Sequence, residues 1–99
     1  MSVDLEDLGA HAVALLDLHS SELHATVVHA ITLRAVAIAN ASQTYQDGEP
    51  TPARALEYQT RANAAQRAYD DTVSAANENY NTAARNIIGG LTKRLETTP

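Results

Sequence analysis

The sequence predicts an all-α protein, an antiparallel hairpin of two long helices, and three observations lead to it. Apolar residues recur every eleven positions in both halves of the 99-residue chain, no useful stretch alternates in the manner of a strand, and one cluster of helix breakers lies near the midpoint. Eleven residues in three turns give about 3.67 residues per turn, close to a straight α-helix. Each apolar row therefore stays on one helix face, and we expect a single helical domain over residues 1–99.

The first helix is expected over residues 3–44. Glu6 and Asp7 would lie in its first turn, where acidic side chains suit the helix dipole. A break at Ser20-Ser21 remains an alternative, because serine favours helix caps. Three rows mark one face of this helix: Leu5, Leu16, Val27 and Ile38; Leu8, His19, Ala30 and Ala41; Ala12, Leu23, Arg34 and Tyr45.

The breaker cluster runs from Asp47 to Pro52, so the turn is expected over residues 46–51. Thr51 is placed to cap the second helix, with Pro52 at its first helical position. That helix is expected over 52–88, with Gly89-Gly90 ending it and a short turn and tail over 89–99. Its rows are Tyr58, Tyr69, Tyr80 and Leu91; Ala62, Val73, Ala84 and Leu95; Ala65, Ala76 and Ile87. We expect each tyrosine ring to pack over small side chains of the facing helix.

The first helix is apolar on more sides than one partner helix covers. Leu15, Leu18, Leu33 and Val36 all lie outside its three rows. Each Leu or Val left in water forgoes about 1.5–3 kcal/mol of burial free energy. We therefore expect oligomerisation to complete a bundle of the coiled-coil kind. The predicted interface residues are Leu5, Leu15, Leu16, Val27, Val28, Ile38, Tyr58, Tyr69 and Tyr80.

Charge argues against two classes of partner. The net charge is −5, with −6 in residues 1–50 and +1 in residues 51–99, and clustered Lys and Arg for a phosphate backbone are missing. The acidic N-terminus is unlike a signal peptide. Arg34 interrupts the apolar stretch 23–41, at a cost of about 2.5–3.5 kcal/mol inside a bilayer. We expect no nucleic-acid partner and no transmembrane helix, and a soluble helix is favoured over a membrane span.

The sequence contains few residues in arrangements suited to metal binding or catalysis. Metal sites on helices pair ligands three or four residues apart, and among the histidines only His19 has such a partner, Glu22. His11, His19, His24 and His29 are all expected to have surface or structural roles. A metal site, which could close only across subunits, and pH sensing are the alternatives. There is no cysteine, no Ser-His-Asp signature and no phosphate-binding glycine loop. We expect no enzyme activity, cofactor or small-molecule substrate.

In size and outline the chain is similar to the Trp-X-Gly proteins exported by type VII secretion. The turn holds Tyr45 and Gly48 but no Trp-X-Gly, and the export pattern of Tyr followed four residues later by an acid occurs only from Tyr45 to Glu49. The resemblance implies an exported helical hairpin that works as a dimer. The favoured hypothesis is a non-enzymatic assembly or adaptor protein that binds itself or another helical protein, such as a subunit of a phage virion. The exported hairpin and an amphipathic protein that binds lipid surfaces are the alternatives.

Overall fold

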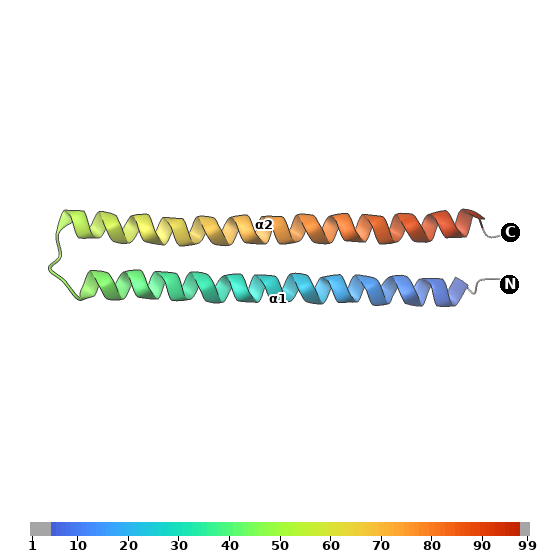
Figure 1. Ribbon diagram of the computed structural model, residues 1–99, viewed down its shortest axis with the longest axis horizontal. Coiled ribbons are helices and arrows are strands. Elements are labelled where there is room, and N and C mark those ends of the chain that lie inside the picture. The colour runs from blue at the N-terminus through green and yellow to red at the C-terminus, as the bar shows by residue number, and fades with distance from the viewer. Residues whose placement is uncertain (1–4, 98–99) are drawn as a thin grey trace. The chain divides into compact units, whose positions relative to one another are not determined.

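A computed structural model describes residues 5–97 and contains two helices, α1 over Leu5–Gln46 and α2 over Pro52–Thr97 (Figure 1). Residues 47–51 join them, and the described residues include no strand. The predicted all-α helical hairpin is confirmed.

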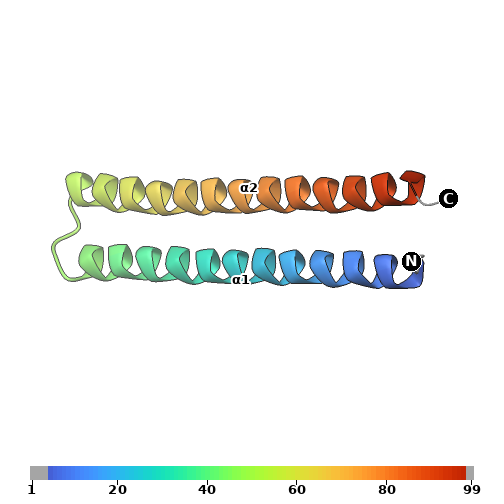
Figure 2. The same ribbon diagram turned by 45° about the vertical axis from the view of Figure 1, so that its right-hand side comes forward.

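Contacts along the chain divide it into two compact units, and each is described by itself. The turn unit comprises Thr26–Ala75, and the terminal unit comprises Met1–Ala25 with Ala76–Pro99. Within each unit, one stretch of α1 runs beside one stretch of α2 in the opposite direction (Figures 1 and 2). The second half of α1 and the first half of α2 form the turn unit, coloured from teal through green and yellow to orange in Figure 1.

Burial follows the eleven-residue rows in both helices. The four buried residues of the described chain, Leu8, Ala12, Ala30 and Ala41, all belong to the predicted rows of α1. In α2 no residue is fully buried, and the half-buried positions fall almost entirely on the predicted rows. In each helix, we call the side that carries these rows the inner face. Because the period is near that of a straight helix, the inner face of α1 stays turned toward α2 within each unit.

The helix α1 is unbroken from Leu5 to Gln46, so it continues through Ser20 and Ser21 and ends two residues beyond the predicted Thr44. The predicted start at residue 3 lies outside the described residues. The alternative of two shorter helices is therefore wrong. His19 and Leu23, on either side of the serines, are half-buried on the inner face, and their packing outweighs the weak helix preference of serine.

The predicted end of the second helix at Ile88 is wrong, because α2 continues through Gly89 and Gly90 to Thr97. Glycine in a helix interior costs about 1 kcal/mol relative to alanine, and packing can offset this. Ile87 and Leu91 flank the glycines and are both half-buried. The packing of the row that includes Tyr80 and Leu91 thus keeps α2 helical through the two glycines.

The cap of α2 forms as predicted. The amide of Arg54 donates to Thr51 Oγ1 over 3.2 Å, the amide of Ala55 donates to the Thr51 carbonyl over 3.0 Å, and α2 begins at Pro52. A threonine cap of this kind is worth about 1 kcal/mol. The start of α2 is therefore fixed by its own first residues.

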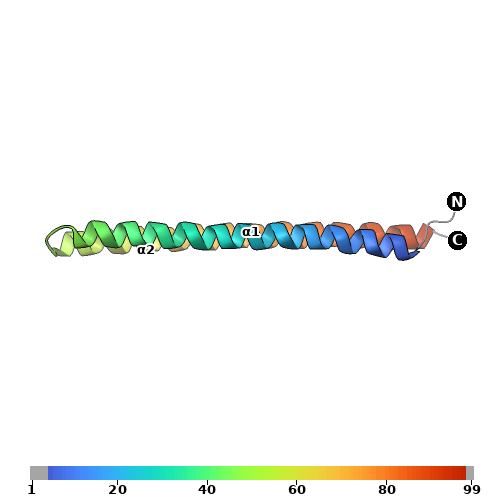
Figure 3. The same ribbon diagram turned by 90° about the horizontal axis from the view of Figure 1, so that it is seen from below.

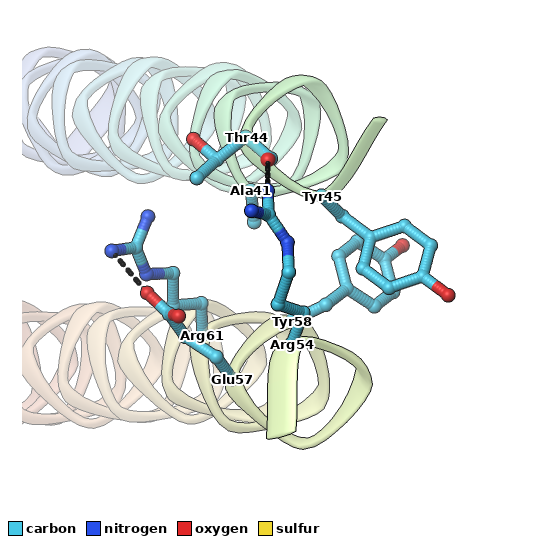
Figure 4. Close-up of a pocket in the computed structure, with 7 residues that line it drawn as sticks. All are labelled: Ala41, Thr44, Tyr45, Arg54, Glu57, Tyr58 and Arg61. Atoms are coloured by element: carbon cyan, nitrogen blue, oxygen red, sulfur yellow. Dashed lines mark hydrogen bonds and ion pairs between the residues drawn. The ribbon is translucent and has the colours of Figure 1, made fainter. Parts of the chain in front are cut away.

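Arg54 also closes the end of α1. Its guanidinium donates to the carbonyl of Thr44 in the last turn of α1, and α1 itself has no basic residue there (Figure 4). A cation at a helix C-terminus is favourable because the last carbonyls carry partial negative charge. A Cβ built on Gly48 would collide with the Arg54 guanidinium, while no glycine of the described chain has a positive φ. Gly48 is thus suited to the turn by its lack of a side chain.

Candidate association surface

Arg34 is the one basic residue of α1, and it faces α2. Its guanidinium carbon lies 3.9 Å from the centre of the Tyr69 ring, and Nη1 donates to Gln66 Oε1 over 3.3 Å. A guanidinium over a tyrosine ring is a cation–π contact. Both contacts lie within the turn unit. The positive charge of α1 is therefore satisfied on the inner face.

The outer face of α1 is left without formal charge over more than six turns. Between Leu23 and Gln46 the sequence has no Asp, Glu or Lys, and Arg34 is its one arginine. Tyr45 of this stretch is half-buried, and its ring lies 5.9 Å from the Tyr58 ring, centre to centre. His24 and His29 of the same stretch are exposed. An outer helix face this poor in charge is unusual for a surface in water, because surface helices normally carry charged residues opposite their apolar stripe.

Large apolar side chains stand exposed on that face. Val28 is 47% exposed, Leu33 56% and Val36 51%, and Ile31 is also exposed. Thr32 lies two residues from both Ala30 and Arg34 of the inner face, or about 200° of helix rotation. Thr32 therefore marks the side of α1 that is turned away from α2. We call Val28, Ile31, Thr32, Leu33 and Val36 the outward patch. Figure 3 views the hairpin from below Figure 1, with α1 in front of α2.

The hydroxyl at the centre of the outward patch already has a partner. Thr32 Oγ1 donates to the carbonyl of Val28 over 3.1 Å, one turn earlier in α1. A hydroxyl that bonds its own helix can enter an apolar contact without losing a hydrogen bond. Thr32 can therefore present its methyl group to a partner, and the exposed His29, about 60° from it, is a polar side chain that borders the patch.

Of the predicted interface residues, the structure places most on the inner face. Leu16, Val27 and Ile38 of α1 and the three tyrosines of α2 are half-buried on rows that meet within the hairpin. Leu15 is half-buried beside them, whereas Leu5 and Val28 are exposed. That these residues contact a second chain remains a prediction. Ile31, Thr32, Leu33 and Val36 were not in the predicted interface, although the absence of charge from Leu23 to Gln46 could have indicated them.

By length and apolarity alone, α1 also meets the requirements of a membrane span, and 11% of its most apolar window is buried. The expected absence of such a segment is not confirmed. The part of α2 in the turn unit, however, exposes five charged residues: Glu57, Arg61, Arg67, Asp70 and Asp71. Each would cost about 2.5–3.5 kcal/mol near the middle of a bilayer. The turn unit as folded is therefore poorly suited to cross a membrane.

Two ion pairs each lie within a single helix. His19 Nδ1 lies 3.6 Å from Glu22 Oε2, as their spacing predicts, and Arg61 pairs with Glu57 over 2.7 Å within α2. Among residues 5–97, no three His, Cys, Asp or Glu side chains gather closely enough to hold a metal ion. Exposed pairs of this kind contribute little to stability. They fix local side-chain positions rather than a reactive site.

One hollow of about 280 Å³ lies in the terminal unit, where Gly90 leaves space opposite Leu8 and Leu15. Its size is near the lower limit of small-molecule sites, and its walls are mostly apolar. A second, much smaller pocket lies at the turn between Tyr45, Arg54 and Tyr58 (Figure 4). The one carboxylate that lines the smaller pocket, Glu57, is paired with Arg61.

Comparison with known proteins adds no family. No family model, no curated protein and no solved structure matches this chain.

Proposed function

We propose that this protein is a non-enzymatic assembly protein that works through helix–helix association, with the outward patch of α1 as its contact surface. The observation that carries the proposal is the outer face of α1, uncharged from Leu23 to Gln46 and exposing Val28, Ile31, Leu33 and Val36. Apolar area is worth about 25 cal/mol per Å² when it leaves water. A second helical surface is the occupant that this face fits best.

The pattern of charge supports a protein partner. On α2 the face turned away from α1 carries the charged residues that keep a helix solvated, among them Arg67 and Asp70, while α1 lacks them over the outward patch. Contact surfaces between proteins are depleted of charge at their centre in the same way. One side of the hairpin is thus suited to solvent and the other to association. An assembly of helical subunits, such as a phage virion, is the kind of particle in which such a protein would serve.

The test is the mass of the purified chain in solution, measured by light scattering over a range of concentrations. We expect an oligomer that the substitution Val36→Asp dissociates, because the carboxylate would have to be buried without a partner. The matched control is Asn63→Asp on the exposed face of α2, which should leave the mass unchanged. A folded monomer at every concentration, with Val36→Asp behaving as the parent does, contradicts the proposal.

A lipid surface is the second candidate, because α1 is long and apolar enough to interact with a bilayer. Proteins that lie on anionic membranes usually carry Lys and Arg beside the apolar face, and the stretch from Leu23 to Gln46 offers none outside the Arg34–Tyr69 contact. Co-sedimentation with anionic and with zwitterionic vesicles separates the two functions. Binding to vesicles that Val36→Asp abolishes would favour the lipid surface over a helical partner.

A further inference from the structure

We propose that the partner of the outward patch is a second copy of this chain, and that the two copies pack α1 against α1 in antiparallel orientation about a two-fold axis at Thr32. This rests on the proposed function and adds the partner, the orientation and the register. Four features of α1 carry it: the symmetry of the patch, its lack of charge, its central hydroxyl, and the position of the acidic residues.

The outward patch is symmetric about Thr32. Val28 and Val36 each lie four residues from it, about 40° to either side of its direction. Ile31 and Leu33 each lie one residue away, about 100° to either side. In an antiparallel pair centred on Thr32, Val28 therefore lies at the level of Val36 of the second copy, while Ile31 and Leu33 lie at opposite edges of the contact, each next to the same residue of the second copy. Self-complementarity of this kind is what a two-fold interface requires.

The centre of the contact tolerates burial. On the two-fold axis Thr32 meets its own copy, and its hydroxyl is already bonded to the carbonyl of Val28. Position 30 and position 34 point toward α2, so the charge of Arg34 stays on Tyr69 and out of the contact. Thr32 would therefore lose no hydrogen-bond partner when the two patches meet. His29, three residues before Thr32 and about 60° to one side, lies at the edge of the contact.

The acidic residues of α1 select the antiparallel orientation. In a parallel pair, Asp17 and Glu22 would each lie beside the same residue of the second copy, and like charges close together are unfavourable. In the antiparallel pair centred on Thr32, Glu22 lies beside Ser42 of the second copy. One pair of like charges remains, Asp17 of one copy and Asp47 of the other. It lies at the exposed ends of the contact, where water and salt screen the repulsion.

The experiment uses single cysteines, since the native chain has none. Chains carrying Thr32→Cys, Val28→Cys or Val36→Cys are oxidised mildly, alone and as a mixture of the Val28→Cys and Val36→Cys chains with different tags. We expect Thr32→Cys to crosslink with itself, and the mixture to give the mixed dimer about ten-fold over either chain alone. Two copies of residue 28 would be offset by eight residues, about 12 Å along the helix, beyond the reach of a disulfide. Asn63→Cys on α2 is the control for random collision.

The outcomes separate this proposal from the function on which it rests. Strong crosslinking of Val28→Cys with itself and of Val36→Cys with itself would show a parallel pair and overturn the antiparallel one. An oligomer by light scattering that gives no more crosslinking at position 32 than at position 63 would also overturn it, while helix-mediated assembly stands. A monomer by light scattering overturns both.

Discussion

The guanidinium of Arg34 lies 3.9 Å from the centre of the Tyr69 ring, and this contact determines which side of α1 is free of charge. Arginine at position 34 interrupts the most apolar stretch of the sequence, although the eleven-residue spacing places it in a row with Ala12, Leu23 and Tyr45. In the structure it is half-buried against α2 and bonded to Gln66. Arg34 therefore interrupts the apolar stretch in the sequence but places no charge on the outer face of α1.

Loss of the ring should release Arg34. We expect Tyr69→Leu to lower the free energy of unfolding by about 0.5–1.5 kcal/mol, because both the cation–π contact and the packing of the ring are lost. Tyr69→Phe keeps the ring and should stay close to the parent. Urea unfolding followed by circular dichroism measures both. Equal losses for the two variants would assign the effect to the hydroxyl instead.

Val27 and Val28 are neighbours in sequence about 100° apart around α1, one on the inner face and the other in the outward patch, and they form a matched pair. Val27 is half-buried against α2, so Val27→Asp should destabilise the hairpin itself by about 2–3 kcal/mol. Val28 is 47% exposed, so Val28→Asp should leave the helix content of the chain intact and weaken association. Circular dichroism and light scattering on both variants test this. An interchange of the two effects would mean that the faces are assigned the wrong way round.

Gly89 and Gly90 lie in the interior of α2, and a Cβ at either position meets nothing within 4 Å. We expect Gly89→Ala and Gly90→Ala each to stabilise the fold by about 0.5–1 kcal/mol, because alanine loses less conformational freedom in a helix. Thermal unfolding measures the gain. A loss of stability in either variant would show that the glycines are needed at a helix end that forms in solution.

Gly48 should respond in the opposite way. A Cβ there collides with the guanidinium of Arg54, so Gly48→Ala should displace the side chain that closes the end of α1. We expect a loss of about 1 kcal/mol, similar to that of Arg54→Met, which removes the same hydrogen bond. Arg67→Met, on the exposed face of α2, is the control. If the losses from Gly48→Ala and Arg54→Met add fully in the double variant, the two residues act independently.

The cap of α2 is the most local of these features. Thr51→Ala removes the acceptor of the Arg54 amide and should cost about 1 kcal/mol of unfolding free energy. Thr51→Ser keeps the hydroxyl and should recover most of the loss. Denaturant unfolding of both variants provides the measurement, and equal stability of the alanine variant and the parent would argue against the cap.

Much of the fold follows from the sequence because its determinants are local or periodic. The eleven-residue rows place Ala12, Ala30 and Ala41 on the inner face, and a threonine before proline marks the start of α2. The end of α2 was missed because two signals conflicted there. Glycine pairs favour a helix end, yet Leu91 continues the row of Tyr80, and the packing of that row prevails.

The association surface was harder to predict for a different reason. The interface predicted from apolar rows fell mostly on residues that the hairpin uses for itself, such as Leu16, Val27 and Ile38. Helical period alone does not say which apolar face meets the chain's own second helix. The contact of Arg34 with Tyr69 identifies the face of α1 that meets α2, and the bond from Thr32 to Val28 lies on the other side of the helix.

The straight inner face has a consequence for how the length of this hairpin can vary. Deleting a single residue within α1 would turn everything beyond it by about 100° and move its inner face away from α2. Adding eleven residues to α1 and eleven to α2 would lengthen each helix by about 16 Å while every row keeps its direction. Natural variants should therefore tolerate single-residue insertions in the turn 47–51 and differ within the helices by whole repeats. The period thus acts as a unit of length by which such a hairpin can grow.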